Sequence, residues 1–94
     1  MIDKSSIENL KQRLDIVDVV GSYLELKKNG ANYKCVCPFH NDTSPSLVVS
    51  PSKQIYHCFA CGAGGDSIKF VMEYEKLPYP EAIEKLALMC NFSL

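Results

Sequence analysis

The chain has 94 residues, a net charge of −1 at pH 7 and a hydrophobic content of 47%. A chain of this length forms one small domain, in which a hydrophobic core alone gives a narrow margin of stability. No apolar run approaches the ~20 residues that span a membrane, and no apolar segment follows the charged residues at the start. We therefore expect residues 1–94 to form a single cytoplasmic domain with no membrane partner.

Two short helices are predicted at the N-terminal end. Ser5 and Glu8 have the spacing of a capping box. Apolar residues then recur at helical intervals, at Ile7, Leu10 and Leu14. Asp15 can cap a second helix, which Gly21 ends.

The central part of the sequence has the pattern of an antiparallel sheet. Alternating residues from Tyr23 to Lys27 predict a first strand, and the Asn29–Gly30 dipeptide that follows is a strong hairpin signal. Further strands are predicted over residues 33–37, 46–49 and 54–57.

Helical signals return after a glycine-rich loop at residues 62–65. Asp66 is a good N-cap for a helix that continues through Tyr74. Pro80 lies at or near the first turn of a closing amphipathic helix that extends to Met89. This order of elements predicts an α+β fold, in which a small antiparallel sheet of four or five strands is flanked by short helices.

Two pairs of metal-binding residue types lie within or beside the predicted sheet. Two residues separate Cys37 from His40, and two separate Cys58 from Cys61. This spacing lets one tight turn present both ligand atoms to a tetrahedral Zn²⁺. Four protein ligands leave no open position on the metal, so the sequence predicts one structural zinc ion rather than a catalytic one. The fifth cysteine, Cys90, has no partner at such a spacing.

Other residues offer alternative ligands. Cys35 points to the same side of its strand as Cys37, and its spacing to His40 is sterically possible. We favour Cys37 because its turn matches that of the second pair. His57 is expected to face the side of its strand away from Cys58, so we favour His40 over His57. Buried thiols with a core histidine are the alternative to a metal site, and the two matched spacings disfavour it.

Positive charge is concentrated in the middle of the chain. Residues 27–57 have a net charge of +3, and the segments on either side each have a net charge of −2. Lysines interleaved with aromatic residues are typical of a face that binds single-stranded nucleic acid, and solvated surface charges are the alternative. The basic residues of this segment are Lys27, Lys28, Lys34 and Lys53.

A longer sequence pattern extends through both ligand pairs. Its central parts are Cys37–His40, Ser44–Ser46 and Lys53–Asp66, and it continues outward through Asp15–Val17, Leu26–Tyr33, Phe70, Met72, Glu73 and Pro80–Ala82. This pattern closely resembles the N-terminal zinc-binding domain of bacterial DnaG-type DNA primases, and the resemblance covers nearly all of the chain.

The resemblance implies a zinc-ribbon fold with a five-stranded antiparallel sheet, and Zn²⁺ held by Cys37, His40, Cys58 and Cys61. It also implies that the domain binds single-stranded DNA template and helps to select where an RNA primer starts. In this family a separate catalytic domain, which acts with Mg²⁺ in cis or in trans, makes the phosphodiester bonds. We expect that domain, and a further domain that contacts the replicative helicase, to lie outside this chain.

The sheet face is the expected binding surface for the template. The predicted DNA contacts are Lys28, Lys34, Lys53, Tyr56 and His57. Two other functions remain open at this point. A structural zinc ribbon could mediate a protein interaction within the replication machinery. An independent zinc enzyme would require an open metal position.

Overall fold

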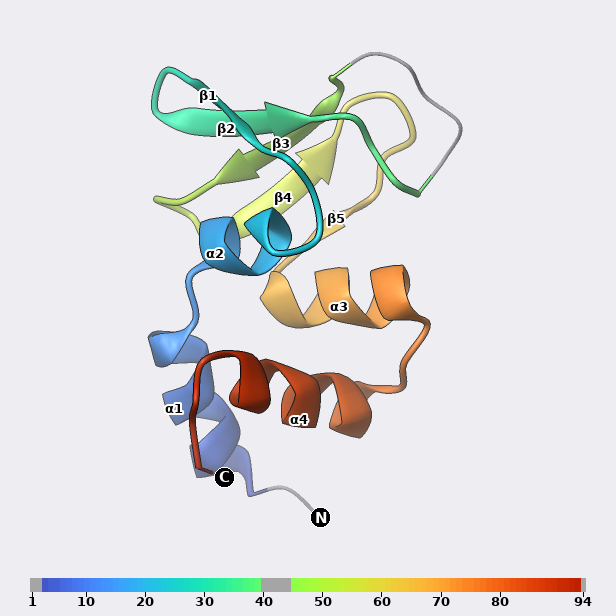
Figure 1. Cartoon of the computed structure of the whole chain (residues 1–94). Coiled ribbons are helices and arrows are strands. Elements are labelled where there is room, and N and C mark those ends of the chain that lie inside the picture. The colour runs from blue at the N-terminus through green and yellow to red at the C-terminus, as the bar shows by residue number, and fades with distance from the viewer. Residues whose placement is uncertain (1–2, 40–44, 94) are drawn as a thin grey trace.

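The computed structural model describes residues 3–39 and 45–93, and their elements follow the predicted α+β order (Figure 1). The bounds of the elements are α1 Lys4–Arg13, α2 Ile16–Gly21, β1 Lys27–Asn29, β2 Asn32–Cys35, β3 Leu47–Ser50, β4 Ile55–Cys58, β5 Gly64–Gly65, α3 Ser67–Glu75 and α4 Tyr79–Met89. In the part of the chain that the structure describes, no helix has the length and apolar character needed to cross a membrane.

The strands form one antiparallel sheet in the order β1-β2-β3-β4-β5, so each strand pairs with its neighbour in the sequence. Residues directly opposite one another on neighbouring strands point to the same side of a sheet. Lys34 of β2 is opposite Val48 of β3, and Val48 is opposite His57 of β4. We call this side the outer face; it also holds Lys27, the β1 partner of Lys34.

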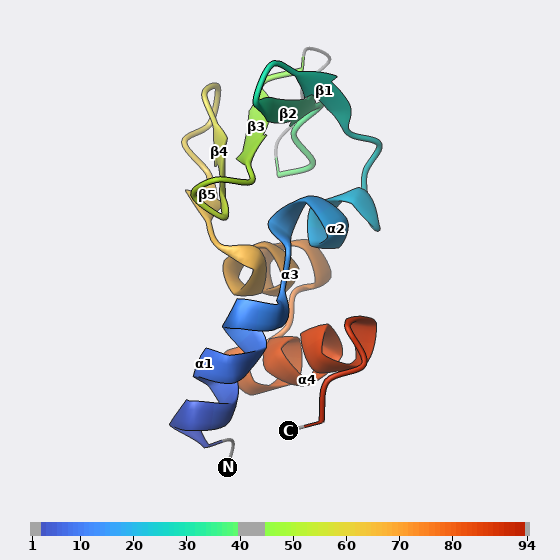
Figure 2. The same cartoon turned by 90° about the vertical axis from the view of Figure 1, so that its left-hand side faces the viewer.

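The other side of the sheet, the inner face, forms one wall of the hydrophobic core. Buried residues alternate with more exposed ones along β3 and β4, as expected for strands with one packed face. Helices α2 and α3 lie against the inner face, and α4 packs on α3 farther from the sheet (Figures 1 and 2). The fully buried side chains include Tyr56 and Leu47 from the sheet, Phe70 from α3, and Ile83 and Leu86 from α4.

Two aspartates begin helices as predicted. The Asp15 carboxylate accepts a hydrogen bond from the Val17 N–H at 3.0 Å at the start of α2. The Asp66 carboxylate accepts one from the Lys69 N–H at 2.9 Å at the start of α3. Each carboxylate satisfies an N–H group that has no partner within its helix.

The other two helix starts have a different origin. Pro80 lies in the first turn of α4, as predicted, where its missing N–H has no cost. The capping box predicted for α1 is wrong: the N-cap is Asp3, and the Ser5 hydroxyl lies inside the helix and donates to the Asp3 carboxylate at 2.5 Å. The helix therefore begins one residue before Ser5.

The strand bounds also differ from the prediction: β2 covers Asn32–Cys35 instead of residues 33–37, β3 and β4 each lie one residue later, and β1 and β5 differ most. The sequence pattern places the first strand at Tyr23–Lys27, whereas β1 covers Lys27–Asn29. The reason is that the N–H groups of Tyr23 and Leu24 both donate to the Val20 carbonyl, at 3.0 and 2.9 Å, and extend the turn after α2. The glycines of β5, predicted as loop, pair with β4.

Candidate functional site

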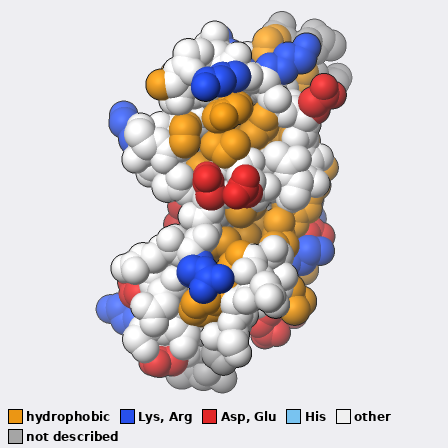
Figure 3. Space-filling view, turned by 60° about the vertical axis from the view of Figure 1, so that its left-hand side comes forward, with side chains coloured by type: hydrophobic (Ala, Val, Ile, Leu, Met, Phe, Trp, Pro, Cys, Tyr) orange, Lys and Arg blue, Asp and Glu red, His pale blue; other side chains and the backbone are white. Residues whose placement is uncertain are grey.

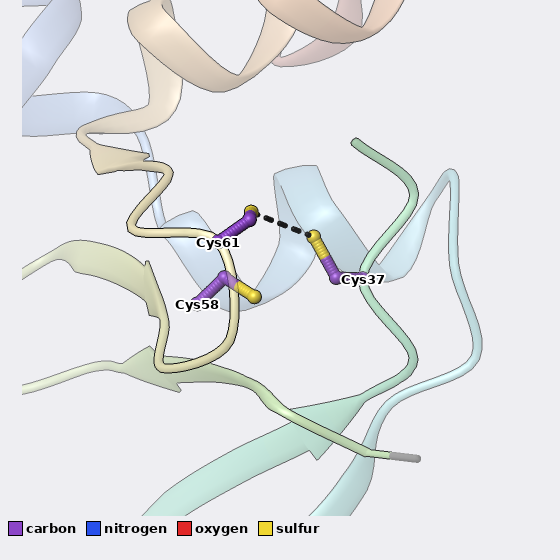
Figure 4. A group of neighbouring side chains, drawn as sticks. All are labelled: Cys37, Cys58 and Cys61. Carbon is purple, nitrogen blue, oxygen red and sulfur yellow. Dashed lines mark hydrogen bonds between the residues drawn. The ribbon is translucent and has the colours of Figure 1, made fainter. Parts of the chain in front are cut away.

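Three of the four predicted zinc ligands lie together at one end of the sheet. The Sγ atoms of Cys37, Cys58 and Cys61 are all within 4.8 Å of one another. Those of Cys37 and Cys61 are 3.8 Å apart (Figure 4). Tetrahedral Zn²⁺ with bonds of about 2.3 Å places two sulfur ligands about 3.8 Å apart, whereas a disulfide bond is only about 2.05 Å long. None of these three described cysteines forms a disulfide bond, and their arrangement fits Zn²⁺.

Tight turns hold these cysteines in place. Cys37 lies two residues beyond the end of β2, and the Phe39 N–H donates to its Sγ at 3.4 Å. Cys58 is the last residue of β4, and its carbonyl accepts the Gly62 N–H at 2.9 Å. Gly62 has φ of +81°, a left-handed conformation that favours glycine. The local sequence after each strand therefore determines where the sulfur atoms lie.

Hydrogen bonds within and around the cluster lower the pKa of one of its thiols, that of Cys58. Burial acts to raise the pKa of the Cys58 thiol, but hydrogen bonds involving Ser46, the N–H groups of Cys61 and Ala60, and Cys37 lower it to about 6. Burial raises the pKa of Cys37 to about 12, and the neighbouring sulfur atoms contribute to the increase. Metal binding requires deprotonated thiols, so the lowered pKa of Cys58 favours its role as a ligand.

The competing ligands occupy other positions. Cys35 is buried on the inner face and lies outside the group formed by the described residues Cys37, Cys58 and Cys61. Burial, followed by the charge of Cys58, raises the pKa of Cys35 to about 11. His57 lies on the outer face and is exposed. His40 falls outside the described residues.

The outer face carries a row of basic and aromatic side chains. Lys27, Lys34 and His57 lie on β1, β2 and β4, with Val48 of β3 between Lys34 and His57. Among residues 3–39 and 45–93, no helix covers this face (Figures 1 and 2). The sheet therefore presents positive charge to solvent on the side opposite the core.

Comparison with known proteins identifies the family. The family model described as CHC2 zinc finger matches residues 2–94. The chain belongs to the CHC2 zinc-finger family. This match and the relatives below confirm the resemblance seen in the sequence, to the zinc-binding domain of DnaG-type primases.

The relatives of this CHC2 zinc finger are much longer proteins. The chain is 57% identical over its whole length to the DNA primase of Campylobacter jejuni and 55% identical to that of Helicobacter pylori strain J99. It covers 16% and 17% of these relatives, about one sixth of their length. A crystal structure of the zinc-binding and RNA polymerase domains of Aquifex aeolicus primase matches 95% of the chain at 53% identity, with a TM-score of 0.90 and 22% of that structure covered. This match confirms the predicted fold.

The CHC2 zinc-finger fold separates the predicted DNA contacts into different surroundings. Lys34 and His57 lie on the outer face, and Lys53 lies in the exposed turn between β3 and β4. Lys28 is exposed, but it pairs with Tyr33 and therefore points to the opposite side of β1 from Lys27.

Tyr56 requires a correction. Its side chain is 1% exposed on the inner face, and its ring lies 5.3 Å from that of Phe70 in the core. Neighbouring residues of a strand face opposite sides, so Tyr56 and His57 cannot both belong to one binding face. A buried ring cannot stack on a nucleic-acid base, so we remove Tyr56 from the predicted contacts.

Two residues of this surface were not selected as contacts from the sequence, although Phe59 is among the aromatic residues interleaved with the lysines. Lys27 was counted in the basic segment but not selected as a contact, because its place opposite Lys34 depends on where β1 begins. Phe59 belongs to the second cysteine turn and is 74% exposed. Its place two residues after His57 was the signal available, since alternate residues in an extended chain share a side.

A groove of about 530 Å³ lies beside β1 and β2. Its volume is within the range of pockets that bind small molecules. Figure 3 shows Lys and hydrophobic side chains next to one another at the end of the molecule that holds the sheet. The residues that line the groove include Lys27, Lys28, Lys34, Leu24, Val36 and Pro45.

Proposed function

We propose that this CHC2 zinc finger binds the single-stranded DNA template of a primase and helps to select where the RNA primer starts. A single structural Zn²⁺, held by Cys37, His40, Cys58 and Cys61, fixes the end of the sheet. The outer face then provides the binding surface.

The observation that supports this proposal best is the row of Lys27, Lys34 and His57 on a sheet face that none of the described helices covers. Single-strand binding proteins combine positive charge along the backbone with ring faces for the bases. The adjoining groove supplies Lys28 and an apolar surface. Lys53 lies at the end of the same sheet.

The metal has an indirect role in this proposal. Bound Zn²⁺ supplies a cross-link between the turn after β2 and the turn after β4, and three thiolates with one imidazole close its coordination. The side chains of Cys37 and Cys58 are buried, so the cross-link joins the core to the sheet end. The residues on the outer face, not the metal ligands, contact the template.

Primer synthesis is assigned to other parts of the longer protein. We propose that a separate catalytic domain, which acts with Mg²⁺ as a nucleotidyltransferase, receives the template from this domain in cis or in trans. The RNA polymerase domain named in the Aquifex structure supports such a division. We propose contact with the replicative helicase for a further domain.

Fluorescence anisotropy with labelled single-stranded DNA tests the proposal. For single strands, the slope of log K against log salt concentration is about −0.7 per phosphate contact. If Lys27, Lys28, Lys34 and Lys53 each neutralise one phosphate, a fourfold rise in salt therefore weakens binding about 50-fold. Lys34→Ala removes one contact, so it reduces the magnitude of this slope by about 0.7 and lowers the affinity. Lys11→Ala, which removes an exposed lysine from α1, is the matched control and leaves both unchanged.

Two results would contradict the proposal. Binding that is indifferent to salt would show that phosphate contacts do not drive it. A zinc-loaded domain that binds no DNA even at low salt would favour the alternative, a structural ribbon that docks on another protein.

A further inference from the structure

Strand β1 lies at one edge of the sheet, and no other strand of the described residues pairs with its free side (Figure 1). A two-residue loop joins β1 to β2, so Asn29 and Asn32 are the pair that flanks the loop. Such a pair exchanges both of its backbone hydrogen bonds, and the next pair, Lys28 and Tyr33, exchanges none. The backbone N–H and C=O groups of Lys28 therefore point away from β2, at the free edge.

The groove beside β1 opens where the two strands of this hairpin separate. Lys27 and Lys34 are the last pair at that end of the hairpin. Beyond them, residues that precede β1 and residues that follow β2 both line the groove, among them Leu24 and Val36. The side chain of Val36 is 44% exposed. Part of the apolar lining is therefore open to a ligand and is not used by the core.

The charges around the groove select the kind of strand that can pair with this edge. Lys27, Lys28 and Lys34 line the groove, and Glu25 is the one acidic residue among its described lining residues. Lysines at a sheet edge oppose pairing with an apolar strand. A second copy of the chain that paired through β1 would place lysines against lysines, which is destabilising. An acidic strand, in contrast, supplies the opposite charges.

The side chains of the groove also distinguish a peptide from a nucleic acid. None of the described residues that line it is aromatic. Proteins that bind single-stranded nucleic acid hold the bases on aromatic rings. A free strand edge instead pairs with the backbone of an extended peptide, whose alternate side chains enter adjoining pockets. The free edge, the apolar lining and the lysines thus fit one class of ligand.

We propose that the edge of β1 and the adjoining groove bind an extended acidic peptide of a partner protein. The peptide adds a strand to the sheet through the backbone of Lys28 and places apolar side chains against Leu24 and Val36. Its carboxylates pair with the surrounding lysines. This inference does not depend on the proposed binding of template and gives the free edge of the sheet a function of its own.

Fluorescence anisotropy with a labelled short peptide, in which valine and aspartate alternate, tests the proposal. We expect saturable binding at low salt that weakens as the salt concentration rises. The same peptide with lysine in place of aspartate should not bind, because its charge is reversed. The acidic peptide with methylated backbone nitrogens should not bind either, because it lacks the donors for strand pairing.

Variants of the protein test the same contacts. Lys28→Glu replaces an ion pair by a repulsion and should weaken binding of the acidic peptide about fivefold. Lys11→Glu reverses the charge of an exposed lysine on α1 and is the matched control, which should bind as the unaltered protein does. Equal zinc content in both variants shows that the fold is retained.

Hydrogen exchange of the Lys28 amide provides the second readout. Because this N–H points away from β2, it should exchange readily in the free domain. Pairing with the peptide protects it, so at about 90% saturation the exchange should slow about tenfold, since only the unbound tenth of the molecules exchanges.

Several outcomes would overturn the proposal. The acidic peptide may bind no better than its lysine or methylated counterpart, or Lys28→Glu may bind it as well as the unaltered protein. Protection of the Lys28 amide by a single-stranded oligonucleotide but not by the peptide would assign the edge to DNA. Protection that grows with protein concentration alone would assign it to a second copy. Template binding is decided separately, by the titration with labelled DNA.

Discussion

Replacing Tyr56 by phenylalanine should make the domain more stable. The Tyr56 side chain is 1% exposed, and its hydroxyl oxygen is buried with no hydrogen-bond partner among the residues that the structure describes. The ring packs against Phe39 and Phe70, with centroids 5.9 and 5.3 Å away. Phenylalanine keeps these ring contacts and removes only the oxygen.

The size of the effect follows from the cost of a buried polar group. Leaving such a group without a hydrogen bond costs about 1–3 kcal/mol, and the small void left by the oxygen offsets part of the gain. We expect the free energy of unfolding to rise by about 1 kcal/mol, which raises the melting temperature by about 4–8 °C in a domain of this size.

Thermal unfolding followed by circular dichroism, with zinc in equal excess, measures this change. Tyr79→Phe is the control: Tyr79 is 43% exposed, and the variant should differ by less than about 0.5 kcal/mol. A fall in melting temperature for Tyr56→Phe would instead show that the hydroxyl has a stabilising partner, contrary to this prediction. The variant should also bind single-stranded DNA as well as the unaltered protein does.

Two further predictions concern the metal and alkaline pH. Elemental analysis of the unaltered protein should find one zinc ion, and Cys37→Ser and His40→Ala should lose it. The variants at residues outside the ligand set should keep it: Cys35→Ala, Cys90→Ala and His57→Ala. Full zinc retention by Cys37→Ser would overturn the proposed ligand set. Burial raises the pKa of Tyr56 to about 12, above the unfolded value of about 10, so its contribution to stability is present below about pH 10 and is lost as the pH rises towards 12. Urea titrations across this pH range should show a smaller loss of unfolding free energy for Tyr56→Phe than for the unaltered protein. An equal loss in both proteins would contradict the raised pKa of Tyr56.

The sequence predicts most of the fold because its strongest signals are local. Asp15 and Asp66 cap helices through their own side chains, and the spacing of Cys58 and Cys61 defines one tight turn. The sequence prediction fails where the structure of a segment depends on contacts with residues that are distant in the sequence. Gly64 and Gly65 carry no side-chain pattern, and only pairing with β4 makes them a strand.

The proposed binding face was predicted in part. Lys34 and His57 were placed correctly on one side of the sheet, but Tyr56 was added to them although it precedes His57 in the same strand. Strand alternation alone excludes that combination. Lys27 could not be assigned with the same argument, because the hydrogen bonds of Tyr23 and Leu24 to Val20 delay the start of β1.

In the proposed function, the outer face of a zinc-held sheet binds the template. Its most direct test is to follow the amide resonances of the zinc-loaded protein by NMR while single-stranded DNA is added. The resonances of α1 and α4 should stay in place, while the shifted resonances should cluster on the outer face, at Lys27, Lys34, Val48, His57 and Phe59. Shifts confined to the helices, or no shifts at any DNA concentration, would contradict it.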